Sequence, residues 1–323
     1  MQIQVIGGGS WGLALTRLLA LNGQAVTLWC RPDDDPDTLR ETRESKRYLP
    51  GVLLPDNVVV SPDVDAGAEM VVYAVPSHAM RAVAPQFRFQ GNPIRVSVAK
   101  GIENDSLLRM SEVLGAVVPG GPIVALSGPS HAEEVGRGLP ASVVAASSDE
   151  PARNAVQAAF FSRAFRVYTS PDIVGVELGG SLKNVVAIAA GVCDGLGLGD
   201  NAKSALITRG LAEMARLGVA CGADPLTFAG LSGMGDLITT CTSRHSRNRG
   251  VGEAIAQGRS LEEILASSPM VAEGVRTARS ARALAARMNV DMPLAEAVGQ
   301  VLFEGLSPGD AIEALMARDA KPE

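Results

Sequence analysis

Short apolar runs alternate with helical patterns in the first half of the chain. Each run has four to six residues, is rich in Val and Ile, and is bounded by Gly, Pro, Ser or Asp, which is typical of buried strands. The predicted strands are Ile3–Ile6, Ala25–Cys30, Met70–Val75, Arg95–Ala99, Ile123–Leu126 and Ser142–Ala146. Helical patterns such as Trp11–Leu21 and Ser106–Leu114 separate several of them. This alternation predicts an α/β fold, in which a parallel sheet has helices on both faces.

The pattern changes after Val167–Tyr168. No convincing strand follows, and long helical patterns punctuated by Gly and Pro replace the short apolar runs. The predicted helices are Asp172–Asp194, Ala202–Leu217, Arg249–Gln257, Leu261–Leu265, Gly274–Arg287, Pro293–Phe303 and Pro308–Met316. We therefore expect an α/β domain over residues 1–170 and an all-helical domain over residues 171–323.

Composition narrows the classes of function. The length of 323 residues suits two domains, and the net charge of −6 argues against a nucleic-acid partner, because phosphate backbones need a basic face. Four separated cysteines and three histidines indicate neither a disulfide framework nor a metal site. No apolar run reaches the ~18 residues of a membrane span, and the N-terminus lacks the features of a signal peptide. We expect a cytoplasmic protein without a metal ion.

The segment from Gly7 to Gly12 has the spacing G-x-G-x-x-G between a predicted strand and a predicted apolar helix. Gly7 permits a tight turn, Gly9 lets the backbone approach a pyrophosphate, and Gly12 allows close packing of the helix on the strand. The N–H groups at the helix start would face the phosphates. The motif predicts a dinucleotide site in a Rossmann-type domain. A glycine turn without a ligand is the alternative.

Arg31 follows the second predicted strand, where this fold commonly has an acidic residue that binds the ribose 2′-hydroxyl of NAD. A guanidinium suits the 2′-phosphate of NADP instead. A solvated surface arginine is the alternative, and the aspartates Asp33–Asp35 could still serve NAD. The predicted cofactor is therefore NADP or NAD.

Two lysines are candidates for acid–base chemistry. Lys100 directly follows a predicted strand, at the sheet edge that binds ligands in this fold, although an exposed turn lysine would give the same pattern. Lys183 is the only cation in the apolar heart of a predicted helix. A helix that is apolar all round is buried, and burial favours a neutral amine that can serve as a general acid or base. The alternative is a lysine whose amine reaches the surface.

A glycine-rich and then basic segment runs from Gly230 to Arg249. Asp236 within it would orient a lysine ammonium or a substrate hydroxyl. The basic part is a candidate phosphate cradle at a helix start, formed by Arg244, Ser246, Arg247, Asn248 and Arg249. A solvated basic loop is the alternative. These residues predict a nicotinamide-dependent oxidoreductase with a lysine acid or base and an anionic substrate, but they do not name that substrate.

The order of these motifs resembles that of bacterial NAD(P)-dependent glycerol-3-phosphate dehydrogenases over nearly the whole chain. The matching motifs are Gly7–Gly12, Val75–Ser77, Ala99–Gly101, Ser127–Glu134, Glu177–Asn184, Gly233–Thr240, Ser246–Asn248 and Val271–Gly274. The resemblance implies reversible reduction of dihydroxyacetone phosphate to sn-glycerol 3-phosphate for phospholipid biosynthesis. It also implies a homodimer and a helical domain similar to that of 6-phosphogluconate dehydrogenase.

The resemblance further implies roles for single residues. Lys183 would be the catalytic general acid that protonates the carbonyl oxygen, and Asp236 would hydrogen-bond in the lysine network. The implied substrate-binding residues are Lys100, Gly128, Ser130, Lys183, Asp236, Ser246, Arg247 and Asn248. The implied cofactor-binding residues are Gly7, Gly9, Ser10, Trp11, Gly12, Arg31, Lys100, Ala132, Arg247, Val271 and Glu273.

Two rival functions remain at this point. One is a dehydrogenase of the same superfamily that acts on a 3-hydroxy acid or on ketopantoate, which the basic segment Arg244–Arg249 disfavours because those substrates have no phosphate. The other is a non-catalytic NADP sensor, in which a lysine inside an apolar helix has no evident purpose.

Overall fold

The computed structural model describes residues 1–267 and 272–319. The chain forms two compact units. Unit 1 comprises Met1–Lys100 and Leu108–Glu177, and unit 2 comprises Gly101–Leu107 and Leu178–Glu323. The sequence analysis placed the domain boundary at residue 170, whereas unit 1 extends to Glu177 and the short segment Gly101–Leu107 belongs with the helical part.

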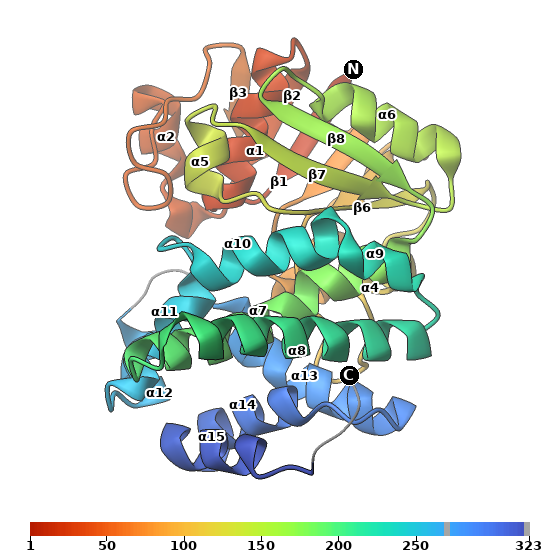
Figure 1. Cartoon of the computed structure of the whole chain (residues 1–323). Coiled ribbons are helices and arrows are strands. Elements are labelled where there is room, and N and C mark those ends of the chain that lie inside the picture. The colour runs from red at the N-terminus through yellow and green to blue at the C-terminus, as the bar shows by residue number, and fades with distance from the viewer. Residues whose placement is uncertain (268–271, 320–323) are drawn as a thin grey trace. The chain divides into compact units, whose positions relative to one another are not determined.

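Unit 1 is built on a single sheet (Figure 1). Within the described residues its strands are β1 (Gln2–Ile6), β2 (Ala25–Trp29), β3 (Val58–Ser61), β4 (Met70–Tyr73), β5 (Ile94–Ser97), β6 (Ile123–Ser127), β7 (Ala141–Ala146) and β8 (Phe165–Ser170). Their order is β3-β2-β1-β4-β5-β6-β7-β8. All neighbours are parallel except β6 and β7, which are antiparallel. The strand order reverses between β1 and β4, and this is the point at which such sheets bind ligands.

The predicted strands all appear, with ends that differ by a few residues. The sequence analysis missed β3, a four-residue strand in which only alternate residues are buried, and it did not list β8 among the predicted strands. It also expected a purely parallel sheet, which the antiparallel pairing of β7 with β6 corrects. The predicted fold class, an α/β sheet domain followed by helices, is confirmed.

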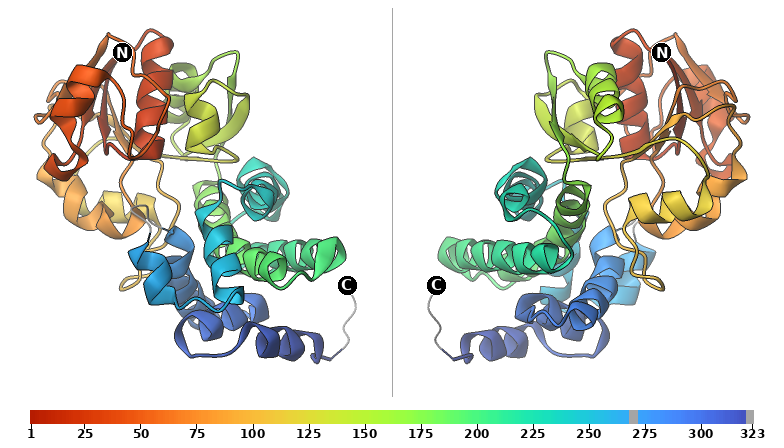
Figure 2. Two further views of the ribbon diagram at one scale, coloured as in Figure 1. Left: turned by 90° about the vertical axis from the view of Figure 1, so that its left-hand side faces the viewer. Right: turned by 90° about the vertical axis from the view of Figure 1, so that its right-hand side faces the viewer.

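Helices cover both faces of the sheet (Figure 2). The helices of unit 1 are α1 (Ser10–Leu21), α2 (Pro36–Thr42), α3 (Met80–Val83), α4 (Met110–Val117), α5 (Ala132–Gly136) and α6 (Glu150–Phe160). Residues of α1, α5 and α6 pack in one apolar core with Val5, Val72 and Val96 of the strands. Residues of α3 and α4 pack in a second core with Ile6, Val71 and Tyr73. Burial of both faces explains why the central strand β4 (Met70–Tyr73) is a continuous run of buried, largely apolar residues.

The helix predicted from Ser106 starts later, at Met110. Leu107 has a φ of 60°, a left-handed conformation that no α-helix contains. The start of α4 is fixed by Glu177, whose carboxylate accepts hydrogen bonds from the Ser111 N–H (2.7 Å) and hydroxyl (2.6 Å) and from Arg109 (2.6 Å). Glu177 therefore joins the start of α4 to the helix that continues into unit 2.

Unit 2 is helical, and no strand follows Ser170 in the part of the chain that the structure describes. Its helices are α7 (Ile173–Gly195, whose first turns belong to unit 1), α8 (Gly199–Ala220), α9 (Pro225–Ala229), α10 (Asp236–Thr242), α11 (Arg247–Ala256), α12 (Leu261–Ala266), α13 (Glu273–Met288), α14 (Pro293–Phe303) and α15 (Pro308–Met316). A π-helical turn, Leu231–Gly235, leads into α10. The sequence analysis predicted all of these except α9, the π-turn and α10.

Helix α7 forms the centre of unit 2. Among the described residues it is the one helix that is long and apolar enough to cross a membrane by length and composition, and 89% of its most apolar window is buried. The sequence analysis searched for an uninterrupted run of apolar residues, and so it did not identify α7 as a candidate membrane span. Burial to this extent is typical of a core helix. The sequence analysis expected the helix that contains Lys183 to be buried in this way.

Candidate active site

The glycine loop lies at the point where the strand order reverses. Gly7 follows β1 with a φ of 120°, and a Cβ there would lie 2.5 Å from the carbonyl oxygen of Ala74, which follows β4. A Cβ at Gly12 would lie 1.9 Å from the carbonyl oxygen of Gly7. Both glycines are therefore required by close packing of the chain on itself.

Gly9 differs from its neighbours. A Cβ at Gly9 would meet no atom within 4 Å, so this glycine leaves open space beside the start of α1. No side chain among the described residues caps that helix start, and no acidic residue lies in its first turn. Open space next to uncapped helical N–H groups fits the pyrophosphate of a dinucleotide. Ser10 and Trp11 form the first turn, and the Ser10 hydroxyl donates to the Tyr48 carbonyl (2.6 Å).

Arg31 makes a bidentate ion pair with Asp34, with N–O distances of 2.8 and 3.1 Å. Tyr48 donates a hydrogen bond of 2.9 Å to the same carboxylate. Burial by itself would raise the pKa of Asp34, but the hydrogen bonds from Arg31 and Tyr48 outweigh it and lower that pKa. The Asp34 side chain is 5% exposed and the Arg31 side chain 59% exposed. The Asp34 carboxylate is therefore bound by other side chains of the protein, whereas the Arg31 side chain is partly exposed to solvent.

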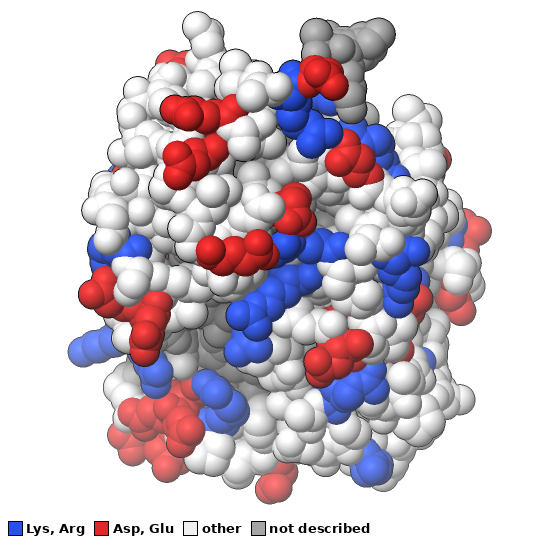
Figure 3. Space-filling view, turned by 90° about the horizontal axis from the view of Figure 1, so that it is seen from below, with Lys and Arg blue, Asp and Glu red and all other residues white. Residues whose placement is uncertain are grey.

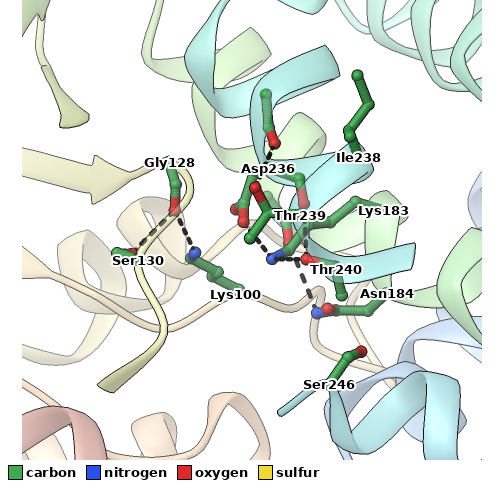
Figure 4. Close-up of polar contacts among 12 residues, drawn as sticks. Lys100, Gly128, Ser130, Lys183, Asn184, Asp236, Ile238, Thr239, Thr240 and Ser246 are labelled. Atoms are coloured by element: carbon green, nitrogen blue, oxygen red, sulfur yellow. Dashed lines mark hydrogen bonds and ion pairs between the residues drawn. The ribbon is translucent and has the colours of Figure 1, made fainter. Parts of the chain in front are cut away.

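Three residues that the sequence analysis assigned to the substrate meet in unit 1 (Figure 4). The Lys100 amine donates to the carbonyl oxygen of Gly128 (2.8 Å), and the Ser130 hydroxyl donates to the same oxygen (2.9 Å). Gly128 has a φ of 142°, and a Cβ there would lie 2.9 Å from the Cα of Val143. The loop after β6 can therefore pack against β7 because position 128 has no side chain. Ala132 starts α5 just beyond this loop.

The catalytic candidate in unit 2 is a buried ion pair. The Lys183 amine on α7 donates to Asp236 Oδ1 (2.5 Å) and to the Thr240 hydroxyl oxygen (2.6 Å) on α10 (Figure 4). Lys183, Asp236 and Thr240 are 5%, 1% and 3% exposed. The Thr240 hydroxyl donates in turn to the Asp236 carbonyl (2.6 Å), which leaves its oxygen free to accept from the lysine.

The Asp236 carboxylate changes the interpretation of Lys183. Sequence analysis treated the lysine as an isolated cation that burial would neutralise. An opposite charge at hydrogen-bond distance favours the ammonium form instead. The close approach depends on glycine, since a Cβ at Gly179 of α7 would lie 2.6 Å from the carbonyl oxygen of Ser232 in the π-turn before α10.

Asn248 joins three helices. Its amide donates to the side-chain oxygen of Asn184 on α7 (2.9 Å), and its own oxygen accepts from the Gly274 N–H in the first turn of α13 (2.9 Å). Asn248 is 8% exposed. The side chain that was predicted to bind substrate thus also has a structural task, which is to connect the start of α11 with α7 and α13.

The predicted phosphate cradle divides into two parts. Ser246 caps α11, where its hydroxyl accepts from the Arg249 N–H (3.2 Å), and Arg247 is the exposed first residue of that helix. The Arg249 side chain instead donates to Asp194 at the end of α7 (2.5 Å). Arg249 is therefore part of the helix packing, and the idea of three arginines around one phosphate is wrong for this residue.

The last predicted cofactor residues lie before α13. Val271 lies outside the described residues. Glu273 is the first residue of α13 and is partly exposed.

Sequence reasoning gave no role to several residues of these networks, namely Tyr48, Asn184, Asp194 and Thr240, although Asn184 and Thr240 lie within the matching motifs. For Thr240 a signal existed, because residues four apart on a helix share a face and Asp236 was already a candidate. Tyr48 and Asp194 are separated by 14 and 55 residues from their partners Asp34 and Arg249, and no local pattern relates such positions.

Among residues 1–267 and 272–319, no three His, Cys, Asp or Glu side chains are grouped to hold a metal ion. The two clusters around Lys100 and Lys183 consist of lysine amines, hydroxyls, a backbone carbonyl and one carboxylate. These groups can transfer a proton and bind an anion.

Comparison with protein-family models gives matches for both parts of the chain. Residues 2–153 match the model described as NAD-dependent glycerol-3-phosphate dehydrogenase N-terminus, and residues 172–313 match the corresponding C-terminus model. The chain belongs to the NAD-dependent glycerol-3-phosphate dehydrogenase family. The resemblance found from the sequence motifs is confirmed.

Individual members of the glycerol-3-phosphate dehydrogenase family are similar over their full length. The glycerol-3-phosphate dehydrogenase [NAD(P)+] of Pelotomaculum thermopropionicum is 53% identical, with 98% of this chain and 93% of the relative aligned. The enzyme of the same name from Chlorobium luteolum is 52% identical, with 100% and 99% aligned. A crystal structure of the glycerol-3-phosphate dehydrogenase of Coxiella burnetii superposes with a TM-score of 0.94 at 37% identity, covering 98% of this chain and 99% of that one.

Proposed function

We propose that the chain reversibly reduces dihydroxyacetone phosphate to sn-glycerol 3-phosphate with NADPH or NADH. The observation that carries the proposal is the buried Lys183–Asp236–Thr240 cluster, which holds an ammonium group as a proton donor. The names of the full-length relatives support this substrate and cofactor.

Residues of unit 1 would provide most of the contacts to the dinucleotide. Gly7, Gly9, Ser10, Trp11 and Gly12 would surround the pyrophosphate, because Gly9 leaves space there and the helix start offers N–H groups. Arg31 would meet the ribose end. Ala132, Glu273, Val271, Lys100 and Arg247 are further cofactor contacts in this proposal. A bound reduced nicotinamide supplies the hydride.

Lys183 would give one ammonium proton to the carbonyl oxygen of the substrate as that carbon is reduced. Loss of the proton leaves a neutral amine beside the Asp236 carboxylate, which favours return of a proton to the lysine. In the oxidation direction the neutral amine would take the hydroxyl proton. Thr240 fixes the amine, since it accepts from the lysine while its own proton is held by the Asp236 carbonyl.

Arg247 and the start of α11 would bind the substrate phosphate. Arg247 is an exposed residue at the start of a ten-residue helix, and Ser246 and Asn248 are its neighbours in the chain. Helix N-termini and guanidinium groups both favour phosphate. Binding of this remote group would orient the reacting carbonyl and so increase turnover as well as affinity. Lys100, Gly128 and Ser130 would be further substrate contacts.

In this proposal residues 1–170 provide most of the cofactor contacts, and residues 171–323 provide the proton donor, the phosphate contacts and the remaining cofactor contacts. We place the enzyme in the cytoplasm as a homodimer that supplies glycerol 3-phosphate for phospholipid synthesis. The free thiols of Cys30, Cys193, Cys221 and Cys241 support a reducing compartment. Acidic side chains lie among the basic ones on the face drawn in Figure 3, which supports a small anionic substrate rather than a nucleic acid.

The decisive experiment is oxidation of NADPH or NADH, followed by absorbance, on addition of dihydroxyacetone phosphate to the purified chain. Ketopantoate and 3-oxo acids serve as competing substrates. Rapid oxidation with dihydroxyacetone phosphate alone supports the proposal. Oxidation with ketopantoate alone, or cofactor binding without any turnover, would overturn it.

A further inference from the structure

Asp194, at the end of α7, has no place in the chemistry proposed above. Its carboxylate accepts two hydrogen bonds from Lys203 on α8 (both 2.8 Å) and one from Arg249 Nε on α11 (2.5 Å). The three side chains are only 16–21% exposed. Burial by itself would raise the pKa of Asp194, but the bonds from Lys203 and Arg249 outweigh it and lower that pKa, so the carboxylate is ionised at neutral pH.

Asp194 acts on the helix that begins with the proposed phosphate contacts. Arg249 lies two residues after Arg247, and a helix turns roughly 100° per residue, so the two side chains point about 200° apart. Holding Arg249 against α7 therefore turns Arg247 away from α7. The burial pattern agrees, because Arg247 is exposed and Arg249 is partly buried.

Close packing also limits the movement of α11 along α7. A Cβ at Gly191 of α7 would lie 1.9 Å from the carbonyl oxygen of Arg249, and one at Gly252 of α11 would lie 1.9 Å from the carbonyl oxygen of Ile188. A Cβ at Gly195 would lie 2.6 Å from that of Ala256. These glycines let the two helix backbones touch, and such a contact resists sliding of α11 along α7.

We propose that Asp194 is a positioning residue for the phosphate end of the substrate: through Arg249 it sets the rotation of α11 and hence the direction of Arg247, without touching substrate itself. This inference rests on the proposed function, since it assumes that Arg247 binds the phosphate. It assigns to α7 two tasks, which are to bear the proton donor Lys183 and to orient the phosphate contact.

The test is Asp194→Asn, which keeps the size of the side chain and removes its charge. We expect the KM for dihydroxyacetone phosphate and the inhibition constant of inorganic phosphate to rise by about tenfold, as for loss of a charge-assisted hydrogen bond. The kcat/KM for unphosphorylated dihydroxyacetone should stay within about twofold, because Lys183 is unaffected. Equal losses on both substrates would overturn the inference.

A second measurement separates positioning from general loosening of the fold. In an Arg247→Ala background, Asp194→Asn should have no further effect on phosphate inhibition, since the two residues act through one contact. Full additivity of the two substitutions would refute the inference. Glu296→Gln is the matched control, because it removes a carboxylate of the same unit whose hydrogen bonds go to Arg282 and Gln300 and not to α11.

Arg249→Met is the reserve variant if Asp194→Asn does not fold, as judged by its melting temperature. It breaks the same contact from the α11 side and leaves Lys203 paired with Asp194. We expect the same selective tenfold loss, and unchanged phosphate inhibition would overturn the inference. If the unmodified chain neither reduces dihydroxyacetone phosphate nor binds inorganic phosphate, the proposed function itself fails, which is a distinguishable outcome.

Discussion

The side-chain oxygen of Asn184 accepts a hydrogen bond of 2.9 Å from the amide of Asn248. Asn184 directly follows Lys183 on α7, and Asn248 directly follows Arg247 on α11. One hydrogen bond therefore links the neighbours of the proposed proton donor and of the proposed phosphate contact. The predictions below test the two ends of this link and the cofactor loop.

Lys183→Ala is expected to lower turnover by at least about 100-fold, the usual contribution of a positioned general acid. NADPH binding, measured by fluorescence titration, should persist. The substitution also leaves the Asp236 carboxylate buried without its partner, which costs about 3–5 kcal/mol of stability. Lys183→Met combined with Asp236→Asn avoids this charge and should show the same loss. Near-normal turnover in the double variant would exclude Lys183 as the acid.

Arg247→Ala should weaken use of the phosphorylated substrate selectively. We expect the KM for dihydroxyacetone phosphate to rise by about tenfold or more, because a charge-assisted contact to the phosphate is lost. Steady-state kinetics with dihydroxyacetone, at saturating cofactor because Arg247 is also a proposed cofactor contact, provide the comparison. A similar loss on that unphosphorylated substrate would count against a phosphate contact, and Arg244→Ala shows how much any nearby charge matters.

Gly9→Ala and Gly12→Ala should separate cofactor binding from stability. The new methyl at position 9 meets no protein atom and Gly9 has an ordinary φ of −73°, so folding should be little affected while dinucleotide affinity falls. The methyl at position 12 meets backbone at 1.9 Å and should cost about 1–3 kcal/mol or more. Thermal unfolding and cofactor titration measure the two effects. Normal NADPH affinity in Gly9→Ala would show that the pyrophosphate does not lie there.

Arg31→Ala tests the choice between the two cofactors. If the exposed face of this guanidinium meets the 2′-phosphate, the KM for NADPH should rise by about tenfold and the KM for NADH should change little. Asp34 also loses its bidentate partner in this variant. Arg31→Lys keeps the charge and should recover part of the NADPH affinity. Equal changes for both cofactors would contradict a 2′-phosphate contact.

Glu213 gives a prediction about pH. Its carboxylate is 4% exposed and accepts from the N–H groups of Leu294 (2.8 Å) and Ala295 (3.2 Å) at the start of α14. Burial raises the pKa of Glu213 despite these two bonds. A carboxyl whose folded pKa exceeds the unfolded value of about 4.3 stabilises the fold fully below that pH, and this stabilisation is lost as pH rises through the folded pKa.

The stability of the unmodified chain relative to Glu213→Gln should therefore decrease as pH rises from about 4.3 toward neutrality. Urea unfolding at several pH values measures the difference. A constant or growing advantage of the glutamate over this range would show that the helix start, rather than burial, controls its ionisation.

Local patterns were sufficient to predict most helices and strands. Helices α14 and α15 have their predicted ends because Pro293 and Pro308 mark their starts. Helix α6 was missed although Asp149 caps it and Pro151 lies in its first turn, so the signal was present but unused. The antiparallel direction of β7 could not be predicted, because alternation along one strand does not report how that strand pairs with another.

The candidate site was predicted residue by residue but not as a network. Lys183, Asp236 and Lys100 were selected from their surroundings in the sequence, and each lies in a hydrogen-bonded cluster. Their partners come from distant segments: Lys183 and Asp236 are 53 residues apart, and so their charge compensation follows from the fold alone. The same holds for Arg249, whose interaction with Asp194 removes it from the predicted phosphate cradle.

The glycine contact between α7 and α11 has a consequence for substrate length. Lys183 and the start of α11 lie on two helices whose backbones touch at Gly191 and Gly252, and such close packing resists a shift that would admit a larger molecule. A ketone with one more methylene between its carbonyl and its phosphate ester could not place its carbonyl at Lys183 and its phosphate at the start of α11 at the same time. The enzyme should therefore discriminate three-carbon from four-carbon keto phosphates by the spacing of these two helices.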